Sequence, residues 1–335
     1  MRHTTINDLA KLLNLSPSTV SRALRNHPDI SNKTKDKVLA MAADTNYQPN
    51  LIAQSLQNRR SNNIGVIVPE IRNTFFSTVI SGIEEVAYEA GYTIMVCQSA
   101  DTYAREVLNT KALAANRVAG MLVSLSQETS DFSHLETVMS QGIPLVLFDR
   151  VAENLEASQV IVDDFTGAYN AAQHLIKQGY KRIAHLAGSQ SLFVSRKRYE
   201  GYAAALINCG MEIKPEYVIS GGYHEEDGKD GMKKLLQLKK IPDAVFAVND
   251  PVALGAFLHI QDMGLKIPED IALVGFSNNP NTRLVRPKLT TVNQPAFEIG
   301  QTAANLLLKS FSDKSVKHEI ETVVLKTELV VRQSS

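Results

Sequence analysis

The sequence of 335 residues contains no tryptophan and only two cysteines, Cys97 and Cys209. Both lie in apolar stretches, which excludes a disulfide framework and is typical of small hydrophobic residues in a reducing compartment. No apolar run reaches the length of a transmembrane helix, and no cleavable leader precedes the first expected helix. We therefore expect a cytoplasmic protein that has no membrane partner.

The sequence patterns of common enzymes are also missing. The chain has no G-x-S-x-G nucleophile turn, no Walker phosphate loop and no G-x-G-x-x-G motif. The run His224-Glu225-Glu226-Asp227 suggests a metal, but acidic residues favour the start of a helix, and no second group of ligands lies at metal spacing. We expect no catalytic residue, no metal and no cofactor.

Overall charge is zero, because 35 lysines and arginines balance 35 acidic residues, but the charges are unevenly distributed. Residues 1–60 hold nine basic and four acidic residues, a net charge of +5, so residues 61–335 carry −5. The basic end is the part expected to meet phosphate groups. A chain of this length exceeds one ordinary domain, which favours a small head and a larger body.

Within the basic segment, residues 16–24 predict a short helix. Ser16 can cap its first turn, and Pro17 suits the first helical position because no amide hydrogen is needed there. Helical spacing gives this helix two faces, an apolar one with Val20, Ala23 and Leu24 and a polar one with Pro17, Ser18, Ser21 and Arg22. An arginine on such a face can bond both acceptors on a guanine edge, and hydroxyls suit phosphate oxygens.

Two further helices complete a three-helix unit. One is expected over Ile6–Leu13, joined to the first by the tight turn Asn14-Leu15, and the other over residues 34–45, after Ser31. Two short helices around a tight turn make a helix-turn-helix, although the bare pattern fits a plain bundle equally well. The next segment, residues 51–60, has too few residues to hold a helix alone in water, so it should order only against a partner.

Residues 5–69, from TINDLAKLLNLSPSTVSRAL to NLIAQSLQNRRSNNIGVIVP, resemble the head and hinge of the lactose-repressor (LacI/GalR) family of bacterial transcription regulators, and the likeness continues over nearly the whole chain. The resemblance implies an α/β protein with a helix-turn-helix head (1–48), a hinge helix and linker (49–62) and a two-lobed, periplasmic-binding-protein-like core of doubly wound parallel sheets (63–335). It also implies contacts of head and hinge with double-stranded DNA by Thr5, Ser16, Pro17, Ser18, Thr19, Ser21, Arg22, Asn26, Ser31, Tyr47, Asn50, Ala53 and Leu56.

In this resemblance Ser16, Thr19 and Ser21 match phosphate contacts, and positions 17, 18 and 22 match base readers. Pro17 departs from the polar residues often found at its position and offers only apolar contact, so the resemblance does not fix the operator sequence beyond what Arg22 dictates. Leu56 either wedges into the minor groove at the operator centre or is an ordinary core leucine. A homodimer on a palindromic operator is implied, and the absence of leucine heptads before Ser335 favours a dimer over a tetramer.

From residue 63 on, short apolar runs alternate with amphipathic segments, which indicates parallel sheets wrapped by helices. The resemblance implies a first lobe of about 63–161 and 293–322 and a second of about 162–290 and 324–332, with crossovers near 161–164, 290–293 and 322–325. The strand before the helix expected over Ala296–Ser310 should return to the first lobe. A cleft between two such lobes is a natural small-molecule site.

Candidate effector-binding residues stand at strand ends and helix starts, or match the family's cleft residues: Phe75, Phe76, Asp149, Arg198, Tyr223, Asn249 and Ser277. The choice of Arg198 and Tyr223 rests on the resemblance. We expect one of the two phenylalanines in the cleft and the other in the core. Asp149 either accepts ligand hydroxyls, or is an ordinary loop acid, or pairs with Arg150. Asn249 either caps a helix or bonds the ligand.

One departure bears on the ligand. After LVGF (273–276) the family usually carries an aspartate that accepts ligand hydroxyls, but here Ser277-Asn278 follow. Neither side chain is charged, so a cationic effector lacks an anchor and a neutral or anionic one is favoured. We predict a sugar or sugar phosphate that controls a repressor of carbohydrate-utilisation genes. The alternatives are a purine-corepressed regulator and an exported sugar-binding protein, which would have no use for residues 1–60.

Overall fold

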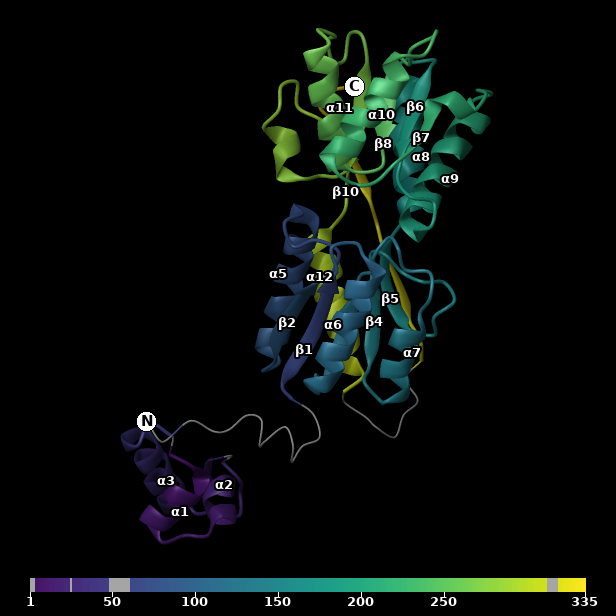
Figure 1. The fold of residues 1–335 in the computed structure, drawn as a ribbon. Helices are drawn as coiled ribbons and strands as arrows, with labels where there is room; N and C mark the ends of the chain where they lie inside the picture. Colours follow the sequence, from purple (N-terminus) through teal and green to yellow (C-terminus); the bar gives the residue numbers. More distant parts are fainter. Residues whose placement is uncertain (1–3, 25, 48–60, 312–318) are drawn as a thin grey trace. The chain divides into compact units, whose positions relative to one another are not determined.

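The computed structural model describes residues 4–24, 26–47, 61–311 and 319–335. The chain folds as two units, a head that ends at Ser61 and a core that begins at Asn62 (Figure 1). The expected hinge positions Asn50, Ala53 and Leu56 lie outside the described residues, so their roles stay predictions.

The head contains the three helices that the sequence predicts. They are α1 (Ile6–Leu13), α2 (Pro17–Leu24) and α3 (Asn32–Asp44), the last beginning two residues earlier than expected. Asn14 adopts a left-handed conformation (φ 52°) between α1 and α2, which asparagine tolerates better than most residues and which makes the tight turn. A small apolar core holds the three helices together: Leu9, Ala10, Val20, Ala23 and Val38 are buried.

The first lobe of the core is built on a six-stranded sheet whose neighbouring strands are all parallel. In spatial order the strands are β11 (Thr322–Leu325), β5 (Ser158–Val162), β4 (Leu145–Phe148), β3 (Gly120–Val123), β1 (Asn63–Val68) and β2 (Thr93–Gln98). One face packs on α5 (Thr74–Glu89) and α12 (Ala296–Lys309), and the other on α6 (Tyr103–Ala115) and α7 (Ser133–Ser140). Because both faces are covered, strands such as β1 consist almost entirely of apolar residues.

The second lobe repeats this arrangement, with one antiparallel edge strand. Its strand order is β12 (Glu328–Val330), β10 (Thr290–Asn293), β9 (Ala272–Ser277), β8 (Ala244–Ala247), β6 (Ile183–Ala187) and β7 (Val218–Ser220), and β12 runs antiparallel to β10. The covering helices are α8 (Asp164–Lys177) and α9 (Phe193–Asn208) on one face and α10 (Glu225–Leu236) and α11 (Asp250–Asp262) on the other. Two short 3₁₀ turns, η1 (Pro215–Tyr217) and η2 (Pro280–Arg283), complete the lobe.

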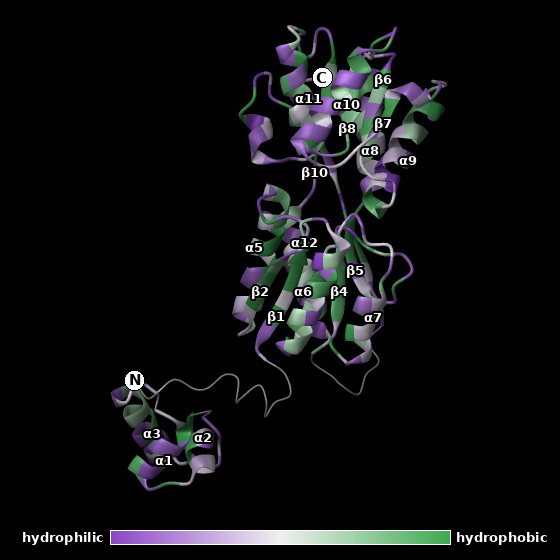
Figure 2. Cartoon of the chain, viewed as in Figure 1, coloured by the Kyte–Doolittle hydropathy of each residue, from purple (hydrophilic) through white to green (hydrophobic). Residues whose placement is uncertain are grey.

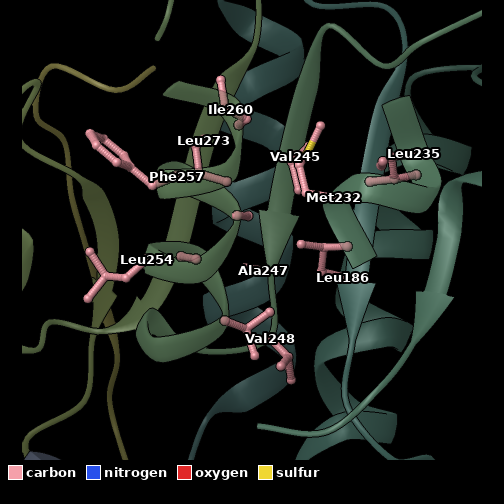
Figure 3. Packing of buried hydrophobic residues seen from close by; sticks show 14 of the residues in the cluster. Leu186, Met232, Leu235, Val245, Ala247, Val248, Leu254, Phe257, Ile260 and Leu273 are labelled. Carbon is pink, nitrogen blue, oxygen red and sulfur yellow. The ribbon is translucent and has the colours of Figure 1, made fainter. Parts of the chain in front are cut away.

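The apolar side chains concentrate where sheets and helices meet. In Figure 2 the strands of both sheets are largely hydrophobic, whereas the helices show hydrophilic residues as well. Figure 3 shows one such layer in the second lobe, where Met232 and Leu235 of α10 and Phe257 and Ile260 of α11 pack near Val245 of β8. Burial of this kind is the main favourable contribution to folding, at about 25 cal/mol per Å² of apolar surface.

Two of the expected crossover positions are in fact strands. Thr290–Asn293, expected to return to the first lobe, pairs with β9 in the second sheet, and Thr322–Leu325 pairs with β5 in the first sheet. Hydrogen bonds also hold β10 in the second lobe. The Thr291 hydroxyl donates to Asp250, and the Thr290 amide donates to the Ser334 hydroxyl. The chain therefore crosses between the lobes after β5, after β10 and after β11.

Paired helices in both lobes approach through glycines. A Cβ built on Gly82 of α5 would lie 2.1 Å from the Phe297 carbonyl oxygen of α12, and one on Gly300 would lie 2.1 Å from the Val79 carbonyl oxygen. In the second lobe Gly228 of α10 and Gly255 of α11 stand in the same relation, with distances of 1.9 and 1.8 Å to backbone oxygens. These helix pairs are therefore in backbone contact, and a methyl group has no room there.

We expect Gly82→Ala to lower the melting temperature, because the added methyl group must push α5 away from α12. Overpacking of this kind costs roughly 1–3 kcal/mol, which corresponds to about 3–10 °C for a chain of this size. Thermal unfolding followed by circular dichroism measures it. The neighbouring exposed substitution Ser81→Ala is the control and should leave the melting temperature nearly unchanged. Equal stability of the two variants would contradict the close approach.

Candidate nucleic-acid interface and effector cleft

The N-terminus of α2 carries a group of exposed or half-buried hydroxyls. Ser16 Oγ accepts a hydrogen bond from the Thr19 amide at 3.1 Å, which confirms Ser16 as the cap of this helix. The same oxygen lies 2.8 Å from both Ser18 Oγ and Thr19 Oγ1. A helix N-terminus with free amides, surrounded by hydroxyls, is a surface to which phosphate oxygens can bind.

The side of α2 that the sequence predicts to be polar faces the solvent. Pro17, Ser18 and Arg22 are exposed and Ser21 is half-buried, whereas Val20 and Ala23 are buried in the core of the head. The exposed guanidinium of Arg22 is therefore available to a partner outside the head. Its expected role on a guanine edge stays a prediction.

The remaining DNA-binding candidates of the head also lie around its helix ends. Thr5 caps α1 by accepting from the Asp8 amide, and Ser31 caps α3 by accepting from the Thr34 amide at 3.3 Å. Asn26 is exposed in a left-handed conformation (φ 53°) after α2. Tyr47 packs half-buried against the core of the head, and this burial raises the pKa of its phenol. All three helices described in the head thus begin at a hydroxyl cap.

In the core, a cavity of about 440 Å³ lies between the two lobes, within the size range of small-molecule sites. Its lining includes all seven predicted effector-binding residues: Phe75 and Phe76 of α5, Asp149 after β4, Arg198 of α9, Tyr223 before α10, Asn249 before α11 and Ser277 at the end of β9. The fold therefore brings together residues that are up to 202 positions apart, Phe75 and Ser277. Their contact with an effector stays a prediction.

Phe75 and Phe76 meet edge to face, with ring centroids 5.2 Å apart. Phe76 is buried in the core of the first lobe, and Phe75 is only partly buried. The expected difference in burial between the two rings is therefore confirmed. Both rings line the cavity, however, whereas only one was expected to do so.

Arg198 is a buried, ion-paired arginine and not a solvated one. Its Nε donates to Asp164 Oδ1 at 2.8 Å, and its Nη1 donates to the Val248 carbonyl at 2.7 Å. The guanidinium carbon lies 3.8 Å from the centroid of the Phe276 ring. Burial raises the pKa of Asp164 to about 6, although the charge of Arg198 opposes the rise. The two charges therefore offset each other beside the cavity, which Arg198 lines.

Asp149 and Arg150 follow β4 directly, but they do not pair with each other as one alternative had it. Arg150 forms its ion pair with Asp101, in the loop after β2. Asp149 is buried in a left-handed conformation (φ 58°), and burial raises the pKa of its carboxyl while Arg150 and Arg198 lower it. A strained, buried carboxyl at a strand end is typical of binding sites.

Asn249 caps a helix, which was one of its two predicted roles. Its Oδ1 accepts a hydrogen bond from the Val252 amide at 2.9 Å at the start of α11. Its Nδ2 donates to the Tyr223 carbonyl, which ties α11 to the segment before α10. Capping uses part of its hydrogen-bonding capacity, and the residue still lines the cavity. Capping and ligand contact are thus compatible.

Ser277-Asn278, where the family usually has an aspartate, adopt φ angles of 123° and 56°. Ser277 Oγ donates to Gln294 Oε1 at 2.8 Å, and the Asn278 amide group donates to Asn293 Oδ1 at 2.9 Å. Asn278 Oδ1 accepts from Arg332, a residue of the segment after β12. This part of the cleft is therefore lined by neutral amides and a hydroxyl held in a fixed network.

Sequence reasoning missed several cleft residues, and three of them come from the end of β10 and the start of α12. Phe297, at the start of α12, is 39% exposed and lines the cavity, as do Asn293 and Gln294 from the second crossing. The available signal was the helix start at Pro295-Ala296 directly after a strand, which is where α/β proteins place ligand-facing residues.

Comparison with known proteins gives the family. Residues 5–50 match bacterial regulatory proteins of the lacI family, and residues 61–328 match the periplasmic binding proteins and sugar binding domain of the LacI family. The chain belongs to the lacI family of bacterial regulatory proteins. It is thus a DNA-binding transcription regulator with an N-terminal helix-turn-helix and a two-lobed α/β core, as the sequence predicted.

This lacI-family chain is similar to several characterised members over nearly its full length. It is 33% identical to the HTH-type transcriptional repressor PurR of Histophilus somni (strain 129Pt), with 98% of both chains covered. The structure of the lac repressor dimer bound to operator and the anti-inducer ONPF matches with a TM-score of 0.87 and 27% identity, covering 99% of each chain. A transcriptional regulator CelR–cellobiose complex matches with a TM-score of 0.76 and 28% identity, covering 99% of this chain and 100% of that one.

Two negative observations concern the described residues alone. No helix in ranges 4–24, 26–47, 61–311 and 319–335 is long and apolar enough to span a bilayer. In the same part of the chain, no three histidine, cysteine or acidic side chains are grouped so that they could hold a metal. The acidic run 225–227 starts α10 and His224 precedes it as the cap, as its helix-start interpretation expected.

We expect Arg198→Met to destabilise the core, because Asp164 would remain buried without its partner. Breaking a buried ion pair costs roughly 3–5 kcal/mol, whereas Arg198→Met combined with Asp164→Leu should recover a large part of that loss. Thermal unfolding of the two single variants and the double variant measures this, with Lys197→Met, which removes a partly exposed pair with Glu200 and a contact with the Phe193 ring, as control. A double variant that loses the sum of both single losses would show that the two charges do not stabilise each other.

Proposed function

We propose that this regulator acts in the cytoplasm at the nucleoid, as a homodimeric repressor of carbohydrate-utilisation genes without catalytic activity. Two heads bind the halves of a palindromic operator, each with the polar face of α2 toward the major groove. The hydroxyls around Ser16 contact phosphates and Arg22 reads a guanine. Support comes from the exposure of this face, the net charge of +5 in residues 1–60 and the similarity to repressors.

Arg22→Ala tests the groove assignment. Loss of the forked contact should cost about 1–3 kcal/mol on the preferred duplex, a loss of roughly 5- to 150-fold, while weak and salt-sensitive binding to other duplexes remains. Fluorescence anisotropy on the promoter fragment of the protein's own gene and on a scrambled duplex, each at two salt concentrations, measures it.

Arg22→Lys is the matched variant, because it keeps the charge and removes the fork. It should lose discrimination between the two duplexes to a similar degree and retain more of the overall affinity. Unchanged discrimination in both variants would remove Arg22 from the base-reading surface.

For the effector we propose a small molecule bound between the lobes, a sugar or sugar phosphate, and among these a neutral sugar. The observation that carries this choice is that both cleft arginines are already paired, Arg198 with Asp164 and Arg150 with Asp101, so neither offers an unpaired charge to a phosphate. The rest of the lining supplies neutral donors and acceptors: Asn73, Asn249, Ser277, Asn278, Asn293 and Gln294. Partly exposed rings, Phe75 and Phe297, can stack on the apolar faces of a sugar.

A purine corepressor is the second candidate. It is favoured by the similarity to PurR repressors, of which the first relatives are 31–33% identical, and by the aromatic rings of the cleft. The sugar is supported by the similarity to a regulator in complex with cellobiose. In either case the ligand changes DNA affinity through the lobes, and a tenfold to hundredfold change needs only about 1.4–2.8 kcal/mol of coupling.

A thermal-shift screen separates the two candidates. We expect a neutral saccharide, from a set with D-glucose, D-ribose and cellobiose, to raise the melting temperature by several degrees, since ligand at a hundredfold excess over its dissociation constant stabilises by about 2.7 kcal/mol. Ribose 5-phosphate, hypoxanthine and guanine form the comparison set. Phe297→Ala should lose most of the shift without a large change in the unliganded melting temperature. A shift with a purine and none with any saccharide would replace the sugar by the purine.

A further inference from the structure

Arg150 connects the two lobes in a way that neither the effector site nor the family assignment accounts for. The residue follows β4 of the first lobe and is only 5% exposed. Its guanidinium carbon lies 5.7 Å from the centroid of the Phe76 ring in the same lobe and 4.6 Å from the centroid of the Tyr223 ring in the second lobe. The arginine thus contacts one aromatic ring from each lobe.

Each partner of Arg150 is anchored in its own lobe. Phe76 packs in the core between the first sheet and α5 and α12. The Tyr223 hydroxyl is hydrogen-bonded to Ser195 of α9, and its carbonyl accepts from Asn249 of α11. Asp101, the ion-pair partner, also accepts from the Gln127 amide at 3.0 Å in the first lobe. A separation of the lobes therefore has to break the contact of Arg150 with Tyr223.

The contact between the guanidinium of Arg150 and the two rings is energetically favourable. A guanidinium is planar and weakly hydrated, so it loses little when it leaves water and gains from the negative face of an aromatic ring, more so in a desolvated site. Asp101 neutralises its charge through a charge-assisted hydrogen bond. The group is thus stable where it lies, without a ligand.

The same three residues, Phe76, Arg150 and Tyr223, line the cavity. A ring-shaped ligand that stacks on Phe76 or Tyr223 therefore meets ring surface that the guanidinium already covers. We propose that Arg150 is an internal occupant of this aromatic surface, which ties the lobes together and which an effector has to displace in order to stack there. The displacement step rests on the proposed effector site, whereas the tie between the lobes does not.

A double-mutant cycle on the full chain tests the tie. Arg150→Met removes the charge and keeps the length, and Tyr223→Leu removes the ring. Each should lower the melting temperature by a few degrees, and the double variant should be little worse than the worse single variant, because both remove the same contact. The control cycle is Lys197→Met with Phe193→Leu, a cation and ring 5.7 Å apart within one lobe. Strictly additive shifts for Arg150 and Tyr223 would overturn the tie.

Hydrogen exchange distinguishes a contact between the lobes from a contact within one lobe, because only loss of the former should change exchange at the crossings. Peptides covering the three crossings, near residues 163, 294 and 326, should exchange faster in Arg150→Met than in the wild type, and at the wild-type rate in Lys197→Met. Unchanged exchange at all three crossings would also count against the tie between the lobes.

Methylguanidinium tests the occupied surface without any knowledge of the effector. At tens of millimolar it should raise the melting temperature of Arg150→Ala, in which the surface is vacant, and not that of the wild type or of Lys197→Ala. No rise in Arg150→Ala would overturn the occupancy. A saccharide that stabilises the wild type should bind about tenfold tighter to Arg150→Ala, whereas weaker binding would mean that Arg150 itself holds the ligand and is not displaced. If no saccharide binds the wild type or Arg150→Ala, the proposed sugar site is wrong. The double-mutant cycle and the methylguanidinium experiment then still test the proposal for Arg150.

Discussion

The effector cleft depends on neutralising buried charge before any ligand arrives. Taking a charged group out of water is costly, and the cost is recovered only when a partner of opposite sign and further hydrogen bonds are in place. Arg198 meets Asp164 and a backbone carbonyl, and Arg150 meets Asp101 and two aromatic rings. The two arginines are therefore held within the protein by their partners, and neutral amides and hydroxyls line the cavity around them.

The two lobes pack their helices and sheets in the same way. Each has a six-stranded sheet covered by two helices on either face, and in each a pair of those helices meets at glycines whose missing side chains allow backbone contact. The carboxyl ends of the strands then carry residues that line the cavity, including Asp149 after β4 and Ser277 at the end of β9. Left-handed φ angles at these two positions place strained backbone at the site itself.

Local patterns in the sequence were sufficient for the helices of the head and for several cleft residues at strand ends, whereas Arg198 and Tyr223 were found only through the family resemblance. Ser16 and Pro17 mark the start of α2 because capping depends on neighbouring atoms only, and residues at strand ends are recognisable from the apolar run before them. The lobe to which β10 belongs was not predictable in this way, since a short strand can pair in either sheet and only its distant partners decide, here Ser334 for Thr290 and Asp250 for Thr291. The partner of Arg150, Asp101, lies 49 residues away and was not predictable for the same reason, and the alternative that paired Arg150 with its neighbour Asp149 was wrong.

One long-range contact also bears on how the protein is made. Asn278 in the cleft is held by Arg332, and the edge strand β12 comes later in the chain than every other strand of its sheet. A ribosome delivers these residues after the rest of both lobes has emerged, so a nascent chain can collapse around its apolar layers while this corner of the ligand site is still unfinished. The sensing pocket thereby matures only after the other strands of both sheets have been made.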